Sequence, residues 1–327
     1  MTPLSSLDGL QAARSRAAVA PADWSSRFEL TGPDRIKVLD GQCTQSIVRR
    51  SVGEGGYGFV LEPKGAVVSD LEFLVLQDRL QLDVPRSHGA GLSSWLTKFL
   101  MLSDAELVDR DAETFGALVL GPDAPAALER VTGTSWGGPE GTGGETAIGG
   151  AAVVIRTDET CGVPGFRLKG AISDHSQVLN ALELPEISDE VCEVLRVEAG
   201  RPRFGVDLDA SVLPKETGQE ARAVDYEKGC YCGQEVVARQ HFIGKARKSL
   251  VGLVTGAEAA VGMSVRDDAG QDLGTLSSVA HSPGREGTLA LAVLKGAEHA
   301  VGAIHRLITQ EGRDAGQAEI AALPFVT

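Results

Sequence analysis

Hydrophobic and polar positions alternate with a period of two in a short segment near the start of the chain. Such alternation is typical of half-buried strands and predicts a strand over 27–30. Short apolar runs separated by turns predict further strands over 57–61, 66–76 and 80–84. Apolar residues at helical spacing predict helices over 33–41 and 93–102. Pro63 and Gly65 stand where a turn between the second and third strands prefers them. This region therefore mixes helices with strands.

Glycine interrupts the pattern in the middle of the chain. Eight glycines fall within residues 133–150, which we expect to be a loop or a flexible insertion. Further strands are predicted over 152–156 and 165–168, and helices over 173–182 and 189–198. Ser188 provides an N-cap for the last helix and Gly200 provides its terminator.

The pattern changes again after residue 249. Six short runs rich in β-branched and aliphatic residues alternate with turns, at 250–254, 263–266, 273–279, 289–294, 305–309 and 318–321. Many short strands at this spacing are typical of a small β-barrel. We therefore expect an α+β region over 1–245 and a C-terminal β-barrel domain over 246–327.

Composition narrows the class of protein. The 327 residues are 43% apolar and 23% charged, as in ordinary globular proteins, and no run of 18 apolar residues could span a membrane. The net charge of -14 repels phosphate backbones and argues against general nucleic-acid binding. Five cysteines do not pair evenly and no secretory signal is recognisable, so we expect free thiols in the cytoplasm.

The most unusual chemistry lies in residues 228–235. Lys228 stands two residues before Cys230, and an ammonium group near a thiol stabilises its thiolate. A helix beginning at Gln234 would direct its positive end toward the same thiol. Cys230 is therefore a candidate reactive thiol, although a buried, inert cysteine fits as well. Cys232 lacks the further ligands that a metal site needs, so we expect no metal.

Three other charged residues have a possible role in binding. Asp70 lies in an apolar strand, where a carboxylate costs desolvation unless it is paired or faces outward. Glu198 lies at the C-terminal end of its helix, where the helix dipole disfavours it. Arg239 belongs to a basic run near the domain boundary, which could hold ligand carboxylates or an acidic partner. Each could instead be an ordinary solvated side chain.

Residues 228–239 resemble the signature of the YgfZ family, which are folate-binding proteins related to the glycine cleavage T-protein, an aminomethyltransferase. The matching residues are Lys228, Gly229, Cys230, Tyr231, Gly233, Gln234, Glu235 and Arg239. Segments 32–45, 63–71 and 196–205 resemble further parts of the same family. Residues 105–165 match nothing specific.

The resemblance implies T-protein-like α/β subdomains, two of them intertwined, that form a tetrahydrofolate site together with the barrel. Asp70 would lie beside the folate nitrogens and Glu198 would recognise the pterin. The implied cofactor-binding residues are Asp70, Glu198, Tyr231, Gln234, Glu235 and Arg239. The implied catalytic residues are Cys230, Lys228 and Asp70, with Lys228 tuning the thiol. Tyr231 could instead serve packing alone.

Three functions follow from the resemblance. The first is a tetrahydrofolate-binding protein whose reactive cysteine serves the assembly, maintenance or repair of iron–sulfur enzymes, which would be its clients and which link it to tRNA modification. The second is a true aminomethyltransferase, in which Asp70 and Glu198 act. The third is a binding module without either chemistry. We expect a monomer in each case.

Overall fold

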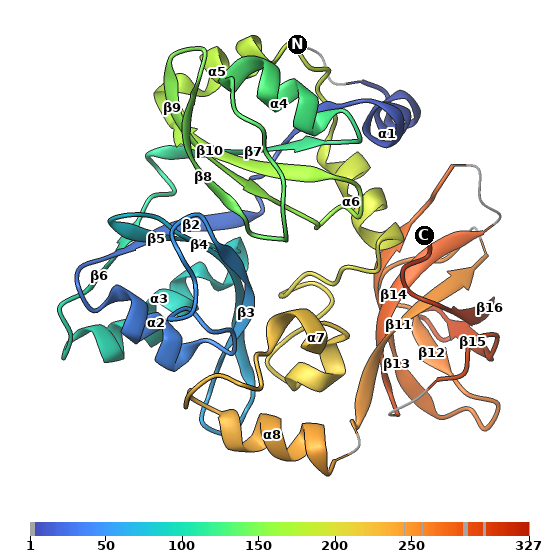
Figure 1. Cartoon of the computed structure of the whole chain (residues 1–327). Coiled ribbons are helices and arrows are strands. Elements are labelled where there is room, and N and C mark those ends of the chain that lie inside the picture. The colour runs from blue at the N-terminus through green and yellow to red at the C-terminus, as the bar shows by residue number, and fades with distance from the viewer. Residues whose placement is uncertain (1–3, 245, 257, 284–286, 297–298, 327) are drawn as a thin grey trace.

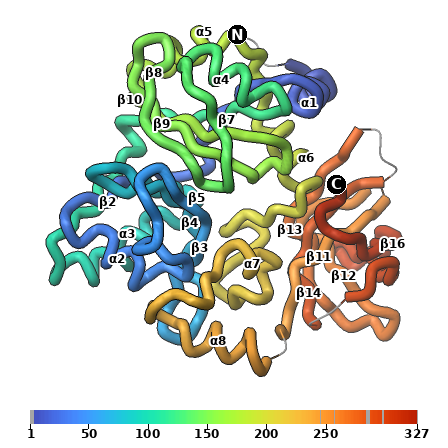
Figure 2. The backbone as a smooth tube through the Cα atoms, viewed as in Figure 1, coloured from blue at the N-terminus to red at the C-terminus, as the bar shows by residue number. Residues whose placement is uncertain are grey.

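The computed structural model describes residues 4–244, 246–256, 258–283, 287–296 and 299–326. Two five-stranded sheets with their helices and one closed barrel surround a central segment that carries α7 (Figures 1 and 2). The helices are α1 (Ser6–Ser15), α2 (Arg35–Gln42), α3 (Gly89–Leu100), α4 (Ala124–Thr132), α5 (His175–Leu182), α6 (Asp189–Glu198), α7 (Glu220–Ala223) and α8 (Gln234–Phe242). Short 3-10 turns occupy Arg86–His88, Ile172–Asp174 and Pro214–Thr217.

The first sheet has the order β3-β4-β5-β2-β6 and is entirely antiparallel. Its strands are β2 (Ser25–Thr31), β3 (Gly55–Leu61), β4 (Val67–Val75), β5 (Arg79–Pro85) and β6 (Glu106–Asp109). Leu71 and Phe73 of β4 pack into the core beneath α2 and α3. Because side chains alternate along a strand, Asp70 and Glu72 point to the opposite face. The strands predicted over 27–30, 57–61, 66–76 and 80–84 are confirmed.

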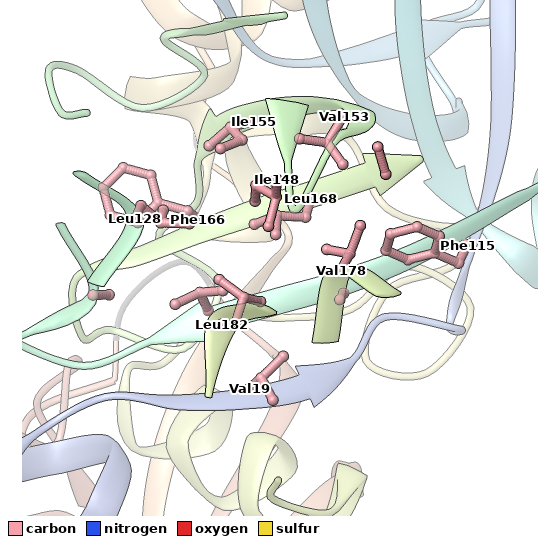
Figure 3. Packing of buried hydrophobic residues seen from close by; sticks show 14 residues of the cluster. Val19, Phe115, Leu128, Ile148, Val153, Ile155, Phe166, Leu168, Val178 and Leu182 are labelled. Atoms are coloured by element: carbon pink, nitrogen blue, oxygen red, sulfur yellow. The ribbon is translucent and has the colours of Figure 1, made fainter. Parts of the chain in front are cut away.

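The second sheet has the order β1-β7-β10-β9-β8. Its strands are β1 (Ala18–Pro21), β7 (Thr114–Leu120), β8 (Gly143–Ile148), β9 (Ala151–Thr157) and β10 (Gly165–Ala171). Helices α4 and α5 bury Leu128 and Leu182 against Phe166 and Val153 of the sheet, as Figure 3 shows. The chain enters this sheet with β1, builds the whole first sheet, and then returns with β7.

The expectation of a loop over 133–150 is wrong for its second half. Residues 143–148 form β8, and Ile148 is fully buried. Gly149 and Gly150 both have positive φ and join β8 to β9 in a two-residue hairpin turn. A Gly-Gly pair before an apolar run is a hairpin signal, and the density of glycine around it hid that signal.

The barrel confirms the expected C-terminal fold. Its closed order is β11-β14-β13-β12-β15-β16, and all six predicted strands are present. They are β11 (Lys248–Thr255), β12 (Ser264–Arg266), β13 (Asp272–Ala280), β14 (Thr288–Lys295), β15 (Ile304–Ile308) and β16 (Asp314–Ala321). The first of them begins three residues after the predicted boundary at residue 245.

One buried arginine joins the barrel to the rest of the molecule. Arg196 of α6 donates to Asp207 at 2.7 Å and to Ser278 of β13 at 2.6 Å. Asp207 also accepts hydrogen bonds from Ser277 and Ser278. This network fixes the segment 201–207 between α6 and the barrel, and that segment forms one wall of the site described next.

Candidate functional site

A pocket lies where the two sheets meet the segment that follows α6. Its lining contains five arginines and three carboxylates together with aromatic and apolar side chains. The lining residues are Trp24, Ser25, Tyr57, Asp70, Leu71, Glu72, Asp83, Val84, Pro85, Thr160, Arg167, Arg196, Arg201, Pro202, Arg203, Phe204, Gln219 and Arg222. In the described part of the chain the barrel strands contribute nothing to this lining, and the expectation that the barrel helps to enclose the ligand stays a prediction.

Asp70 and Arg222 are residues of this pocket whose hydrogen bonding is incomplete, and Asp70 is the acidic one. Its Oδ2 accepts a hydrogen bond of 2.8 Å from the hydroxyl of Tyr57. Its Oδ1 is buried and has no hydrogen-bond partner. Burial raises the pKa of Asp70 to about 6, although the Tyr57 hydrogen bond acts in the opposite direction. A buried, unsatisfied carboxylate oxygen is costly, and a ligand N–H group would satisfy it.

Tyr57 and Arg222 hold Asp70 from one side. The Arg222 guanidinium stacks on the Tyr57 ring, with its central carbon 3.7 Å from the ring centroid. Arg222 also pairs with Glu140 at 3.1 Å. Burial raises the pKa of Tyr57 well above its usual value, so this phenol stays protonated and donates a hydrogen bond to Asp70. No local signal in the sequence marks Tyr57 or Arg222, which meet only in the folded chain.

Trp24 forms part of the wall of this pocket. The Arg167 and Arg203 guanidinium carbons lie 5.5 Å and 5.4 Å from its ring centroid, within cation–π range. Phe204 lines the same wall. The flat aromatic groups and the surrounding arginines suit a planar ligand that also carries negative charge.

The signature residues lie elsewhere, and Lys228 has a structural task. Its ammonium donates to the carbonyl oxygens of Asp40, Cys43 and Gln45 at 2.6, 2.7 and 3.0 Å. These carbonyls belong to the end of α2 and the residues that follow it. Since three carbonyls take its three N–H groups, the position of Lys228 does not support the prediction that it tunes Cys230.

Tyr231 and Gly233 also serve packing. Tyr231 is buried in an apolar cluster with Phe59 and Leu61, and burial raises its pKa to about 12. Gly233 has φ +83°, and a Cβ there would lie 2.7 Å from the Glu62 carbonyl oxygen. The glycine thus permits close contact with the turn after β3. Tyr231 does not line the pocket around Asp70, so its position does not support the predicted role in cofactor binding.

Cys230 and the start of α8 form an exposed face outside the pocket. Cys230 is exposed and Cys232 is half-buried, whereas Cys43, Cys161 and Cys192 are buried. The predicted helix start at Gln234 is confirmed. The other residues predicted to contact folate here are Gln234, Glu235 and Arg239, and none of them lines the pocket around Asp70. The structure therefore separates the thiol from the candidate ligand site.

This burial pattern predicts an order of thiol reactivity. Iodoacetamide is expected to alkylate Cys230 first and Cys232 more slowly, because alkylation needs an accessible thiolate. The buried cysteines should react only after unfolding in urea. Mass mapping of the modified peptides checks this order, with Cys230→Ser as the control. Rapid modification of Cys161 in the native protein would contradict it.

Glu198 is placed away from Asp70. Its Oε1 accepts hydrogen bonds from Arg14 of α1 and from Ser282 of the segment after β13. The side chain is 2% exposed and does not line the pocket. The cation of α1 offsets the unfavourable helix dipole noted in the sequence. Its position therefore does not support the predicted contact with a pterin and gives it a structural role.

Glu198→Gln is accordingly expected to lower the free energy of unfolding by about 1–2 kcal/mol, because a charged, buried contact with Arg14 is lost. Its effect on ligand affinity should be negligible. Urea titration and a binding isotherm check both, with Glu190→Gln on the exposed side of α6 as the control. Unchanged stability with a tenfold loss of affinity would restore the pterin contact.

Two further findings concern the described residues alone. They contain no group of three histidine, cysteine or acidic side chains placed to hold a metal ion. They also contain no helix with the length and apolar character needed to cross a bilayer.

Comparison with known proteins assigns the chain to a family. The profile of the GCVT N-terminal domain family matches residues 6–228, which is more than half of the chain. The chain belongs to this family. The GCVT match includes the entire lining of the pocket and ends at Lys228, just before Cys230.

Several relatives of this chain are named aminomethyltransferase. A protein of Streptomyces avermitilis named aminomethyltransferase is 28% identical, over 96% of this chain and 87% of its own length. A protein of Thermosipho melanesiensis with the same name is 26% identical, over 88% of this chain and 80% of its own length. The crystal structure of glycine cleavage system aminomethyltransferase T from Bartonella henselae superposes with a TM-score of 0.88 at 18% identity, covering 100% of this chain and 91% of that one. That likeness confirms the expected fold.

Proposed function

We propose that the pocket around Asp70 binds tetrahydrofolate. The observation that carries this proposal is the buried Oδ1 of Asp70, which lacks a hydrogen-bond partner and belongs to a residue that lines an aromatic, arginine-rich pocket. A reduced pterin has N–H groups for this oxygen and a flat ring for the aromatic walls, and its glutamate suits the arginines. The pocket fits the group on chemical grounds, and the family relatives support the same ligand.

Asp70 orients this ligand as an acceptor. With a pKa of about 6, its carboxyl group is mainly ionised at neutral pH and can accept a ligand N–H. Tyr57 occupies Oδ2 and so directs Oδ1 to the ligand. Tetrahydrofolate supplies a nitrogen that accepts one-carbon units, and a carboxyl group of this pKa beside it can hold or release a proton.

Titration of the protein with tetrahydrofolate tests the proposal. Trp24 lines the pocket, so its fluorescence should report binding. We expect saturable binding by the natural chain and by Cys230→Ser, and binding at least tenfold weaker by Asp70→Asn, because the charge-assisted hydrogen bond is lost. Equal affinity of the chain and Asp70→Asn would place the ligand elsewhere.

The finer proposal concerns the thiol and the YgfZ family. Cys230 is the exposed working group of a cytoplasmic, monomeric protein that serves the assembly, maintenance or repair of iron–sulfur enzymes, and through them tRNA modification. Its exposure and its separation from the pocket support a thiol that acts on a protein partner. Deletion of the gene should lower the activity of an iron–sulfur enzyme in extracts. The natural chain should restore that activity and Cys230→Ser should not; full rescue by Cys230→Ser would refute the thiol role.

A second candidate function is aminomethyl transfer to tetrahydrofolate. Asp70 favours it, because a carboxyl group with a pKa of about 6 suits proton transfer at the folate nitrogens. Relatives that span most of the chain are named aminomethyltransferase. An assay with aminomethyl-loaded lipoyl carrier protein decides it: methylene-tetrahydrofolate must form with the natural chain and not with Asp70→Asn. Absence of product from the natural chain would exclude this activity.

A further inference from the structure

Arg201 lies between two cavities. One is the pocket around Asp70. The other is lined by parts of β9 and β10 with their connecting loop, by residues 199–201, and by Leu323, Pro324 and Val326 near the C-terminus. Arg201 and Gln219 line both cavities. A ligand that extends from Asp70 toward the second cavity therefore passes the Arg201 guanidinium.

Arg201 is held by one exposed partner and one buried partner. Its Nη2 donates to Glu159 at 2.8 Å, and the Glu159 side chain is 54% exposed. Its Nη1 donates to the Oε1 of buried Gln219 at 3.3 Å. Exposed ion pairs contribute little to stability, so Glu159 can leave at small cost while Gln219 keeps the guanidinium in place.

The surroundings of Arg201 favour an additional carboxylate. Burial, and then repulsion from the neighbouring Arg222 guanidinium, lower the pKa of Arg201. Arg222 has its own partner in Glu140, which is only 16% exposed and therefore not easily displaced. Of these two arginines, Arg201 is thus the one whose carboxylate partner can exchange with a ligand.

We propose that Arg201 recognises a carboxylate of the ligand's glutamyl tail, and that Glu159 occupies the place of this carboxylate in the free protein. The inference rests on the proposed binding of tetrahydrofolate. On binding, the tail carboxylate replaces Glu159 at the Arg201 guanidinium, and Glu159 turns to solvent. Arg201 is then a specificity-determining residue, and Glu159 is an internal competitor of the ligand.

The proposal requires opposite effects from the two partners of one ion pair. Tetrahydrofolate is compared with tetrahydropteroate, which lacks the glutamate. Arg201→Gln should weaken tetrahydrofolate binding about tenfold, whereas Glu159→Gln should strengthen it about twofold to fivefold. Neither variant should alter the affinity for tetrahydropteroate, and thermal melts should confirm that both variants fold.

A matched control is available on another face of the molecule. Glu145 pairs with Arg79 at 2.6 Å and is 53% exposed, so Glu145→Gln removes the same charge from a similar ion pair. It should leave both affinities unchanged. Unchanged or weaker tetrahydrofolate binding by Glu159→Gln overturns the inference while the proposed function stands. If the natural chain binds neither compound, the proposed function fails and this inference fails with it.

Discussion

Lys228→Met is expected to destabilise the fold by about 3–5 kcal/mol. The ammonium of Lys228 is the donor for the carbonyl oxygens of Asp40, Cys43 and Gln45, and it lies 3.5 Å from an Asp40 carboxylate oxygen. Methionine has a similar length but no donor, so these acceptors would stay buried without partners. Burial lowers the pKa of Lys228 because it disfavours the charged ammonium, and the neighbouring Asp40 carboxylate acts in the opposite direction.

Urea unfolding at pH 7 measures this effect. Lys248→Met provides the control, because Lys248 makes one exposed contact to Ser211 and its loss should cost less than about 1 kcal/mol. The result also distinguishes a structural role of Lys228 from a role in activating the Cys230 thiol. If the variant unfolds like the natural chain while alkylation of Cys230 slows, then Lys228 activates the thiol and the structural interpretation is wrong.

Asp70→Asn is expected to stabilise the protein at pH 8 by about 3 kcal/mol while it weakens ligand binding at least tenfold. Burial in the folded state raises the pKa of Asp70 from 3.8 to about 6. Between these two pH values the folded chain keeps a proton on Asp70 that the unfolded chain has lost. The free energy of unfolding therefore falls as pH rises from about 4 to about 6 and stays reduced above that range. Asparagine does not ionise and avoids this loss.

Thermal unfolding at pH 4 and pH 8 tests the sign. The gain of Asp70→Asn should be present at pH 8 and nearly absent at pH 4. Asp83 lines the same pocket and provides the opposite case: burial alone would raise its pKa, but Arg156 and Arg167 hold it below its usual range. Asp83→Asn should therefore lose stability at pH 8. A destabilised Asp70→Asn at pH 8 would contradict the raised pKa.

The elements of the fold could be predicted because their signals are local. Short apolar runs between turns marked the strands around Asp70, and the short runs after residue 249 marked all six barrel strands. The error at β8 arose where a Gly-Gly hairpin turn lay inside a longer glycine-rich segment. There the local signals for a turn and for a loop are the same. The strands β1, β6 and β7 and the helix α4 were not predicted.

The site could be predicted only where a residue conflicted with its own segment. Asp70 was such a residue, a carboxylate in an apolar strand, and it lies in the pocket. Glu198 showed a similar conflict at its helix end, but Arg14, from a helix 184 positions away in sequence, resolves it. Spacing along the chain does not distinguish these cases, because the compensating charge comes from a distant segment.

The sequence by itself determined most of the strands and helices, the barrel, the family resemblance and one pocket carboxylate. Only the tertiary structure placed Tyr57, Arg201 and Arg222 around Asp70, directed Lys228 to the carbonyls after α2, and left Cys230 exposed outside the pocket. The physical reason is the separation along the chain over which each kind of signal acts. Strand and helix patterns depend on neighbouring residues, whereas a binding pocket and its pKa values depend on charges and burial supplied by segments far apart in the chain.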